Sequence, residues 1–104
     1  MATAEIPVEF IFESGSIFAI NDISPQAPTH VLIIPKAHHE NAGELAKASG
    51  DLLSQMHSAA AKIASDSGLD GYRSVFNTGA SAGQSVFHAH LHLLGGRPFA
   101  WPPG

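Results

Sequence analysis

Three histidines, His88, His90 and His92, recur at every second position near the end of the chain, separated by apolar residues. This alternation predicts a β-strand over residues 85–94, with the three imidazoles on one face and the apolar side chains on the other. Neutral imidazole, with a pKa of ~6.5, can act as a nucleophile or proton carrier near neutral pH. The small residues of the preceding loop, 79–85, can offer backbone N–H groups to an anion. Together the two features favour chemistry at a phosphorus centre.

A purely structural row of histidines and a metal site are the alternatives. The strand rise of ~3.3 Å per residue places the backbones of His88 and His92 roughly 13 Å apart. Ligand distances near ~2 Å cannot span that separation, so the three histidines cannot readily share one ion. A metal site would need two of them together with His30, Asp22 or Glu40. Nothing in the spacing demands such a site, and we expect no metal and no cofactor.

The composition limits the other classes of function. The 104 residues predict one domain with one core, and the net charge of −4 comes with only five scattered basic residues. We therefore expect no nucleic acid polymer as a partner. The sequence has no cysteine, which excludes disulfides and Cys-based zinc sites. No apolar run reaches the ~20 residues of a membrane helix, and residues 1–5 lack the features of a signal peptide. We expect a cytoplasmic protein without a membrane partner.

The elements that must position the histidines can be predicted from periodicity. Four further segments are typical of strands: residues 8–13, 17–23, 30–35 and 71–77. A helical apolar stripe predicts the main helix at residues 50–67, with Ser49 or Asp51 near its N-cap and Gly68 at its end. Residues 43–48 are predicted to form a short helical turn. This order predicts an α+β domain with a mostly antiparallel sheet and one covering helix.

The histidine segment also resembles a known family. Residues 88–94 fit the signature His-φ-His-φ-His-φ-φ, where φ is apolar, of the histidine triad (HIT) superfamily. Further segments are similar to its Hint branch, the histidine triad nucleotide-binding proteins: residues 22–30, 34–36, 77–85 and 95–97, and the Trp-Pro-Pro-Gly end. The resemblance implies one HIT domain over residues 1–104, with a tail at 97–104. It implies a five-stranded antiparallel sheet, with one main helix and a short helical turn, that continues across a homodimer.

The resemblance implies an activity as well. It implies a nucleoside phosphoramidase, a hydrolase that cleaves purine nucleoside phosphoramidates at the P–N bond, and acyl-adenylates, without a metal. The reaction would pass through a nucleotidyl-histidine intermediate and release a nucleoside monophosphate, so the small-molecule partner is an AMP-like purine nucleotide. By similarity, His90 is the nucleophile, and His88 and His92 bind and orient the phosphate. His30 would hydrogen-bond to the triad and hold its tautomers.

The substrate contacts follow from the same resemblance. They are Asp22 for the ribose, Ile20 and Ile23 for the base, Asn77, Gly83, Gln84 and Ser85 for the phosphate or leaving group, and Trp101 for the partner subunit's site. Simpler interpretations remain open for some of them. Asp22 could be a turn aspartate, Asn77 a strand cap and His30 a core histidine, while Trp101 could pack on its own subunit. We expect His38, His39 and His57 to be solvated and Lys36 to be a loop cation without chemistry.

Two alternatives and one departure from the family qualify these expectations. The protein could be a nucleotide-binding interaction module with incidental hydrolysis, or a dinucleoside polyphosphate hydrolase. The Trp-Pro-Pro-Gly end argues against the second. Hint proteins usually carry a longer segment before the Glu5-Ile6-Pro7 stretch, with apolar residues that wall the base. Because residues 1–4 replace that segment here, we expect a more open base pocket.

Overall fold

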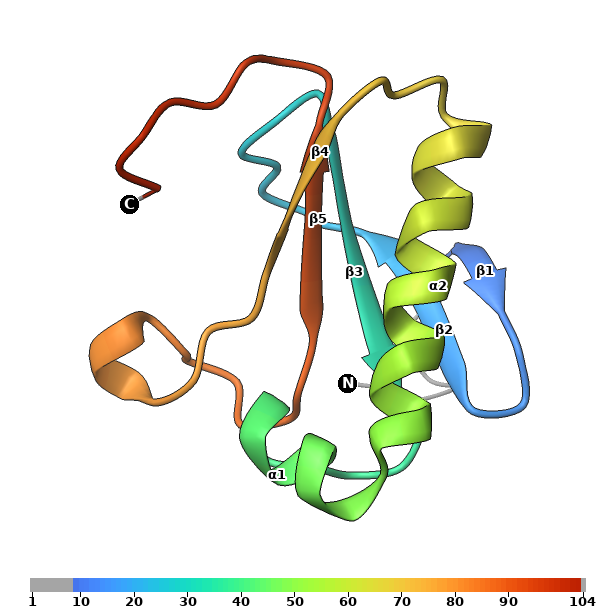
Figure 1. Ribbon diagram of the computed structural model, residues 1–104, viewed down its shortest axis with the longest axis vertical. Helices are drawn as coiled ribbons and strands as arrows, with labels where there is room; N and C mark the ends of the chain where they lie inside the picture. Colours follow the sequence, from blue (N-terminus) through green and yellow to red (C-terminus); the bar gives the residue numbers. More distant parts are fainter. Residues whose placement is uncertain (1–8, 104) are drawn as a thin grey trace.

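The computed structural model describes residues 9–103, which form a single five-stranded sheet with helices on one face (Figure 1). In chain order the elements are β1 (Phe10–Glu13), β2 (Ile17–Asn21), β3 (Thr29–Pro35), α1 (Ala42–Ala48), α2 (Gly50–Asp66), β4 (Tyr72–Val75), the 3₁₀ turn η1 (Ala80–Ala82) and β5 (Leu91–Gly95). Two predictions fall outside the described residues: the start of the first strand at Val8, and the substitute N-terminal segment at residues 1–4.

All neighbouring strands of the sheet are antiparallel, in the order β1-β2-β3-β5-β4. The predicted α+β class with a five-stranded antiparallel sheet is therefore confirmed. In the pairing of β3 with β5, His30 lies opposite Leu94, and Leu32 lies opposite His92. Side chains alternate between the faces of a sheet, so His30 and His92 project from the same face as diagonal neighbours.

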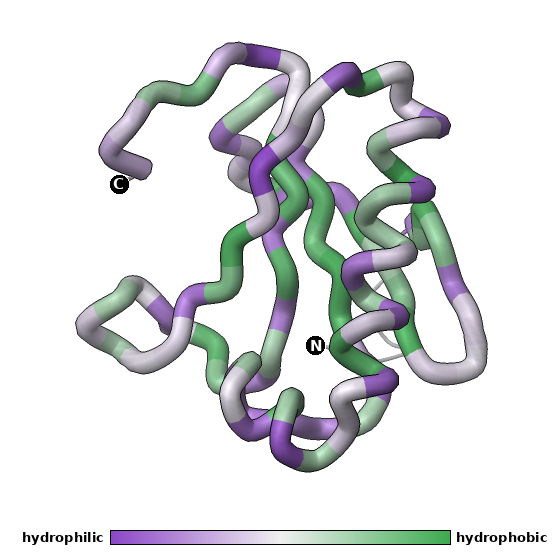
Figure 2. Tube along the Cα trace, in the orientation of Figure 1, coloured by the Kyte–Doolittle hydropathy of each residue, from purple (hydrophilic) through white to green (hydrophobic). Residues whose placement is uncertain are grey.

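The opposite face of the sheet forms the core with α2. The buried residues of α2 are Leu52, Met56, Ala59, Ala60, Ile63 and Ala64, and they pack against buried residues of β3 and β5 that include Val31, Ile33, Leu91 and Leu93. Figure 2 shows hydrophobic residues along β3 and an alternation of hydrophobic and hydrophilic residues along α2. This burial holds β3 and β5 in register, and with them the two histidines on the far face.

The ends of α2 confirm the predicted caps. The Ser49 hydroxyl accepts a hydrogen bond from the Leu52 N–H at 3.1 Å, which satisfies a free donor of the first turn. At the other end, Gly68 has a φ of 72°, and the N–H of Leu69 donates to the carbonyl of Ala64 at 3.0 Å. The left-handed conformation is accessible to glycine without strain, so the chain can leave the helix here and enter β4.

β2, β4 and β5 are shorter than the alternation predicts, whereas β3 begins one residue earlier than predicted, at Thr29. The difference matters most for β5. It begins at Leu91, so His88 and His90 precede the regular strand. Strand pairing explains the difference. The pairing of β3 with β5 ends at Ile33 opposite Leu91, and the pairing of β4 with β5 ends at Val75 opposite His92, so no strand in the described part of the chain pairs with residues 85–90. Without a neighbouring strand, residues 85–90 run instead beside the loop at residues 36–41, where the Ala89 N–H donates to the His39 carbonyl at 2.7 Å.

Two other strand ends also differ from the prediction. β2 ends at Asn21 because the Asp22 carboxylate accepts the Ser24 N–H at 2.8 Å and so starts a turn. β4 ends at Val75, where its pairing with β5 ends. The predicted helical turn at residues 43–48 is α1, a seven-residue helix capped by the Asn41 side chain. Within residues 9–103, no helix is long and apolar enough to cross a membrane.

Candidate active site

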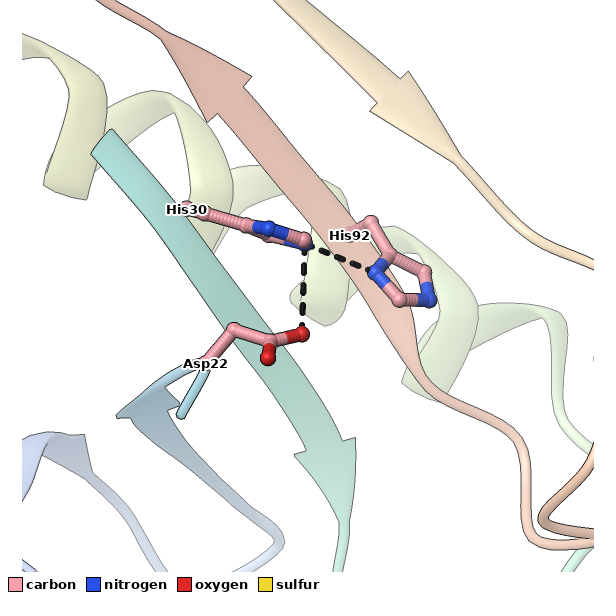
Figure 3. Close-up of side chains that lie close together, drawn as sticks. All are labelled: Asp22, His30 and His92. Atoms are coloured by element: carbon pink, nitrogen blue, oxygen red, sulfur yellow. Dashed lines mark hydrogen bonds and ion pairs between the residues drawn. The ribbon is translucent and has the colours of Figure 1, made fainter. Parts of the chain in front are cut away.

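Three predicted site residues meet on the open face of the sheet. Asp22 follows β2, His30 lies on β3 and His92 lies on β5 (Figure 3). The Nε2 atom of His30 is 2.9 Å from Nδ1 of His92 and 3.4 Å from Oδ2 of Asp22. His30 is buried and His92 is half-buried. The sheet therefore brings together residues that are far apart in the sequence.

A backbone amide fixes the proton positions of this pair. The N–H of Gln26 donates to Nδ1 of His30 at 3.0 Å, so this nitrogen carries a lone pair. In neutral imidazole the other nitrogen then holds the hydrogen, so Nε2 of His30 donates to Nδ1 of His92. His92 in turn carries its hydrogen on Nε2. The expected role of His30 in holding a triad tautomer has this hydrogen bond as its physical basis.

His90 has its proton fixed in a different way. Its Nδ1 atom is 2.8 Å from the carbonyl oxygen of His88, and a carbonyl oxygen can only accept. Nδ1 of His90 therefore donates, and Nε2 keeps the lone pair that a nucleophile needs. The rings of His90 and His92 lie 4.9 Å apart between centroids. The His90 ring, whose Nε2 has a lone pair, thus lies beside the His92 ring, whose Nε2 is a hydrogen-bond donor.

The electrostatics of the site favour neutral His92. Burial lowers the pKa of His92 below 6.5, and the nearby imidazoles of His90 and His30 lower it further. The Asp22 carboxylate acts in the opposite direction. The neutral form agrees with the hydrogen-bond pattern, because only neutral His92 can accept at Nδ1 from His30.

The His88 side chain is turned toward the loop at residues 36–41. Its Nε2 atom is 2.8 Å from the carbonyl oxygen of Pro35, and its Nδ1 atom is 3.1 Å from Nδ1 of His38. The sequence predicts a solvated His38; it is exposed, as expected, but it hydrogen-bonds to His88. No periodic pattern signals this contact, because the two residues are 50 positions apart and neither lies in a regular element.

The loop before the triad is held by Gln84. The side-chain oxygen of Gln84 accepts the Gly79 N–H at 2.8 Å, and its amide group donates to the carbonyls of Glu40 at 2.8 Å and Val86 at 3.1 Å. Only 4% of Gln84 is exposed. The side chain of Gln84 therefore holds the loop together by internal hydrogen bonds, whereas the family resemblance implies that it contacts the substrate. Gly83 has a φ of 97° and ends η1.

One cluster in the described part of the chain has the spacing of a metal site. Ligand atoms of Asp22, His30 and His92 all lie within 4.8 Å of one another. The donors do not fit an ion, however. A neutral histidine that binds a metal through Nε2 carries its hydrogen on Nδ1, and Nδ1 of His30 already faces the Gln26 N–H. Two N–H donors would then oppose each other, so the hydrogen-bond pattern of this cluster does not fit a metal ion.

Known proteins are similar to this chain in sequence. The family model described as the HIT domain matches residues 3–99 of the chain. The chain belongs to the HIT domain family. The purine nucleoside phosphoramidase of Escherichia coli (strain K12) is 45% identical to it over 96 residues, which covers 90% of this chain and 81% of that protein. The 14 kDa zinc-binding protein of Zea mays is 49% identical over 104 residues, covering 96% of this chain and 80% of that protein.

Solved structures of HIT proteins have the same fold. The crystal structure of a HIT family hydrolase from Legionella pneumophila Philadelphia 1 superimposes with a TM-score of 0.91 at 49% identity, covering 96% of this chain and 91% of that chain. A histidine triad protein from Clostridium difficile gives a TM-score of 0.86 at 36% identity, covering 92% of this chain and 85% of that chain. At these identities the likeness extends beyond the fold to the family.

The remaining predicted site residues of this HIT domain differ in their exposure. Asn77 and Ile20 are half-buried, while Gly83 and Ser85 are exposed. Ile23 is fully exposed and Trp101 is 83% exposed, so neither side chain is buried within its own chain. Asp22 does act as a turn aspartate, but its second carboxylate oxygen faces His30.

Proposed function

We propose that the protein is a nucleoside phosphoramidase that hydrolyses the P–N bond of purine nucleoside phosphoramidates, and also acyl-adenylates, through a covalent intermediate on His90. The observation that carries this proposal is the hydrogen bond from Nδ1 of His90 to the His88 carbonyl at 2.8 Å, which leaves Nε2 with its lone pair. The E. coli relative, named a purine nucleoside phosphoramidase, supports the choice of substrate class.

The reaction proceeds in two displacements. Nε2 of His90 attacks phosphorus, the P–N bond breaks, and the amine leaves with the bonding electron pair and a proton from solvent. Water then attacks the phosphorus, the bond to Nε2 breaks, and a proton returns to solvent as the nucleoside monophosphate departs. The Nδ1 hydrogen stays on His90, held by the His88 carbonyl throughout. Two inversions at one phosphorus give net retention of configuration.

Fixed donors stabilise the charge on the phosphoryl oxygens. The Nε2–H of His92 is one such donor, and its orientation is set by the hydrogen bond from His30. Ser85 and the N–H groups of the loop around Gly83 are the others, since both residues are exposed beside the triad segment. Neutral His92 donates this hydrogen without bringing a positive charge next to the nucleophile.

The exposed apolar residues provide the nucleoside contacts. Ile23 and Trp101 are among the most exposed large apolar side chains of the described residues, at 102% and 83%. We assign Ile23, with Ile20, to the purine base and Asp22 to the ribose hydroxyls. Asn77 contacts the phosphate or the leaving group. Trp101 reaches the site of a second subunit in a homodimer through which the sheet continues, because an exposed tryptophan is a typical interface anchor.

The test compares turnover of a fluorogenic adenosine phosphoramidate, in the presence of a chelator, by the wild type and by His90→Ala. His57→Ala is the matched control, because His57 is exposed on α2, which covers the opposite face of the sheet. We expect the His90 variant alone to lose activity. Turnover that survives in His90→Ala, or a wild type that binds nucleotide without hydrolysing the substrate, would refute the proposal.

A further inference from the structure

We propose that His38 is a positioning residue that acts through His88 on the nucleophile His90. In this account the His88 ring fixes the backbone around it and does not bind the phosphate. The proposal rests on the proposed function of His90 and adds a residue to it. The proposal starts from the 3.1 Å contact between Nδ1 of His38 and Nδ1 of His88, which has no part in the two displacement steps described above.

Both ring nitrogens of His88 are occupied within the protein. The Pro35 carbonyl can only accept, so Nε2 of His88 carries a hydrogen and donates to it at 2.8 Å. In neutral His88, Nδ1 then has the lone pair and accepts, and the donor must be Nδ1–H of His38. The two rings also pack together, with centroids 5.1 Å apart. Neither nitrogen of His88 is left to bind a phosphate oxygen.

His88 hydrogen-bonds to the nucleophile His90 through its backbone carbonyl and not through its side chain. Its carbonyl oxygen accepts the Nδ1 hydrogen of His90, and this bond selects the tautomer with a nucleophilic Nε2. The carbonyl lies in residues 85–90, which have no neighbouring strand to hold them. A misdirected carbonyl would let the hydrogen of His90 move to Nε2, and that tautomer has no lone pair on Nε2 with which to attack phosphorus.

Contacts with the loop at residues 36–41 replace the missing strand. The Ala89 N–H donates to the His39 carbonyl at 2.7 Å, and the Gln84 amide donates to the Glu40 carbonyl at 2.8 Å. These two bonds hold the segment on either side of His88. The contact of His38 with His88 is the one that holds the His88 side chain to this loop, and it requires a donor at the position of Nδ1.

This requirement distinguishes two nearly isosteric substitutions. In His38→Asn the side-chain NH₂ group takes the position of Nδ1 and can still donate to His88. In His38→Asp only acceptor oxygens face the lone pair of His88, and this contact is repulsive unless His88 becomes protonated. A role in packing alone would be affected equally by the two substitutions, whereas a donor role is retained only by asparagine.

The experiment measures the imidazole ¹⁵N signals of His90 and the turnover of the adenosine phosphoramidate, in wild type, His38→Asn, His38→Asp and His38→Ala. We expect wild type and His38→Asn to show a protonated Nδ1 and a lone-pair Nε2 on His90. The Asp and Ala variants should show averaged tautomers and a fall in kcat of about tenfold or more, with KM little changed. His57→Ala is the matched control.

The proposal is overturned if the His90 signals of His38→Asp and His38→Ala match those of the wild type. It is overturned equally if the Asn and Asp variants are impaired to the same degree. Because asparagine and aspartate differ by one group, their comparison remains decisive even if His38→Ala does not fold. The ¹⁵N signals require no substrate, so a wild type without phosphoramidase activity would refute the proposed function but leave this test intact.

Discussion

The imidazoles of His30 and His92 hydrogen-bond across β3 and β5, with Nε2 of the first 2.9 Å from Nδ1 of the second. They are diagonal neighbours in the sheet, and the Gln26 N–H at the far side of His30 sets the direction of the bond. One backbone amide thus determines the tautomers of two histidines. A substitution at the buried His30 should therefore alter the tautomer of His92 even though it leaves the exposed residues of the site unchanged.

Replacing His30 with alanine should reduce both stability and activity. The substitution removes a buried ring and leaves Nδ1 of His92 without its donor. An unsatisfied buried polar atom costs about 1–3 kcal/mol, so we expect the free energy of unfolding in urea to fall by at least that amount. Turnover should fall with it, since His92 no longer has a fixed Nε2–H. Unchanged stability and turnover would show that the hydrogen bond has no role.

The pKa of His92 should respond to its neighbours with opposite signs. His90→Ala removes a neighbouring imidazole that lowers this pKa because two protonated rings would repel each other, so the pKa should rise toward 6.5. Asp22→Asn removes the carboxylate that raises it, so the pKa should fall further. Titration of the His92 ring signals by NMR measures both changes. A shift of either variant in the other direction would contradict the electrostatic account.

The same pKa has a consequence for stability. His92 resists protonation in the folded protein and takes up a proton in the unfolded chain as the pH falls through 6.5. Between this pH and the lower pKa of the folded state, the unfolded chain binds more protons, so the free energy of unfolding decreases as the pH falls. In urea unfolding, wild type should therefore lose more stability than His92→Gln over this acidic window. Equal losses would show that His92 does not contribute.

Gln84→Ala should disorder the loop before the triad. It removes an acceptor for Gly79 and donors to Glu40 and Val86 from a residue that is 4% exposed. We expect a loss of about 1–3 kcal/mol in unfolding free energy, together with faster amide exchange in the loop. Ser81→Ala is a control in the same loop, because that side chain is exposed. Equal effects of the two substitutions would contradict the structural role of Gln84.

Gly96 should not tolerate a side chain. Its φ is 89°, and an added Cβ would lie 2.9 Å from Cβ of the rigid Pro28 ring. Gly96→Ala should therefore destabilise the protein by about 1–3 kcal/mol, as measured by thermal unfolding. Gly71→Ala is the comparison, since a Cβ at Gly71 meets nothing within 4 Å. A Gly96 variant as stable as the Gly71 variant would show that β5 can end in another conformation.

Much of the fold can be predicted because its signals are local. The apolar stripe of α2, the Ser49 cap and Gly68 each depend on residues a few positions apart. The alternation around the triad is also local, but it predicts a strand over residues 85–94, and the strand begins at Leu91. The start of β5 depends on where β3 and β4 pair with it. The ends of those two strands cannot be predicted from the residues of β5 alone.

In the site, too, the features with a local sequence signal can be predicted and those that depend on the assembled fold cannot. The motif singles out His88, His90 and His92, the family resemblance adds His30, and the structure adds the directions of their hydrogen bonds. The contact of His38 with His88 and the inward side chain of Gln84 are not predicted, because they depend on how two loops meet at one end of the sheet. Such contacts have no period in the sequence and emerge only from the assembled fold.

The most direct test of the central claim is to identify the residue that becomes covalently modified. The protein is mixed with excess adenosine phosphoramidate, quenched rapidly under conditions that preserve N–P bonds, digested and analysed by tandem mass spectrometry. We predict an added adenylyl group on His90, and none on any histidine of His90→Ala. An adenylyl group on His88 or His92, or steady turnover with no modified histidine at any time, would contradict nucleophilic catalysis by His90.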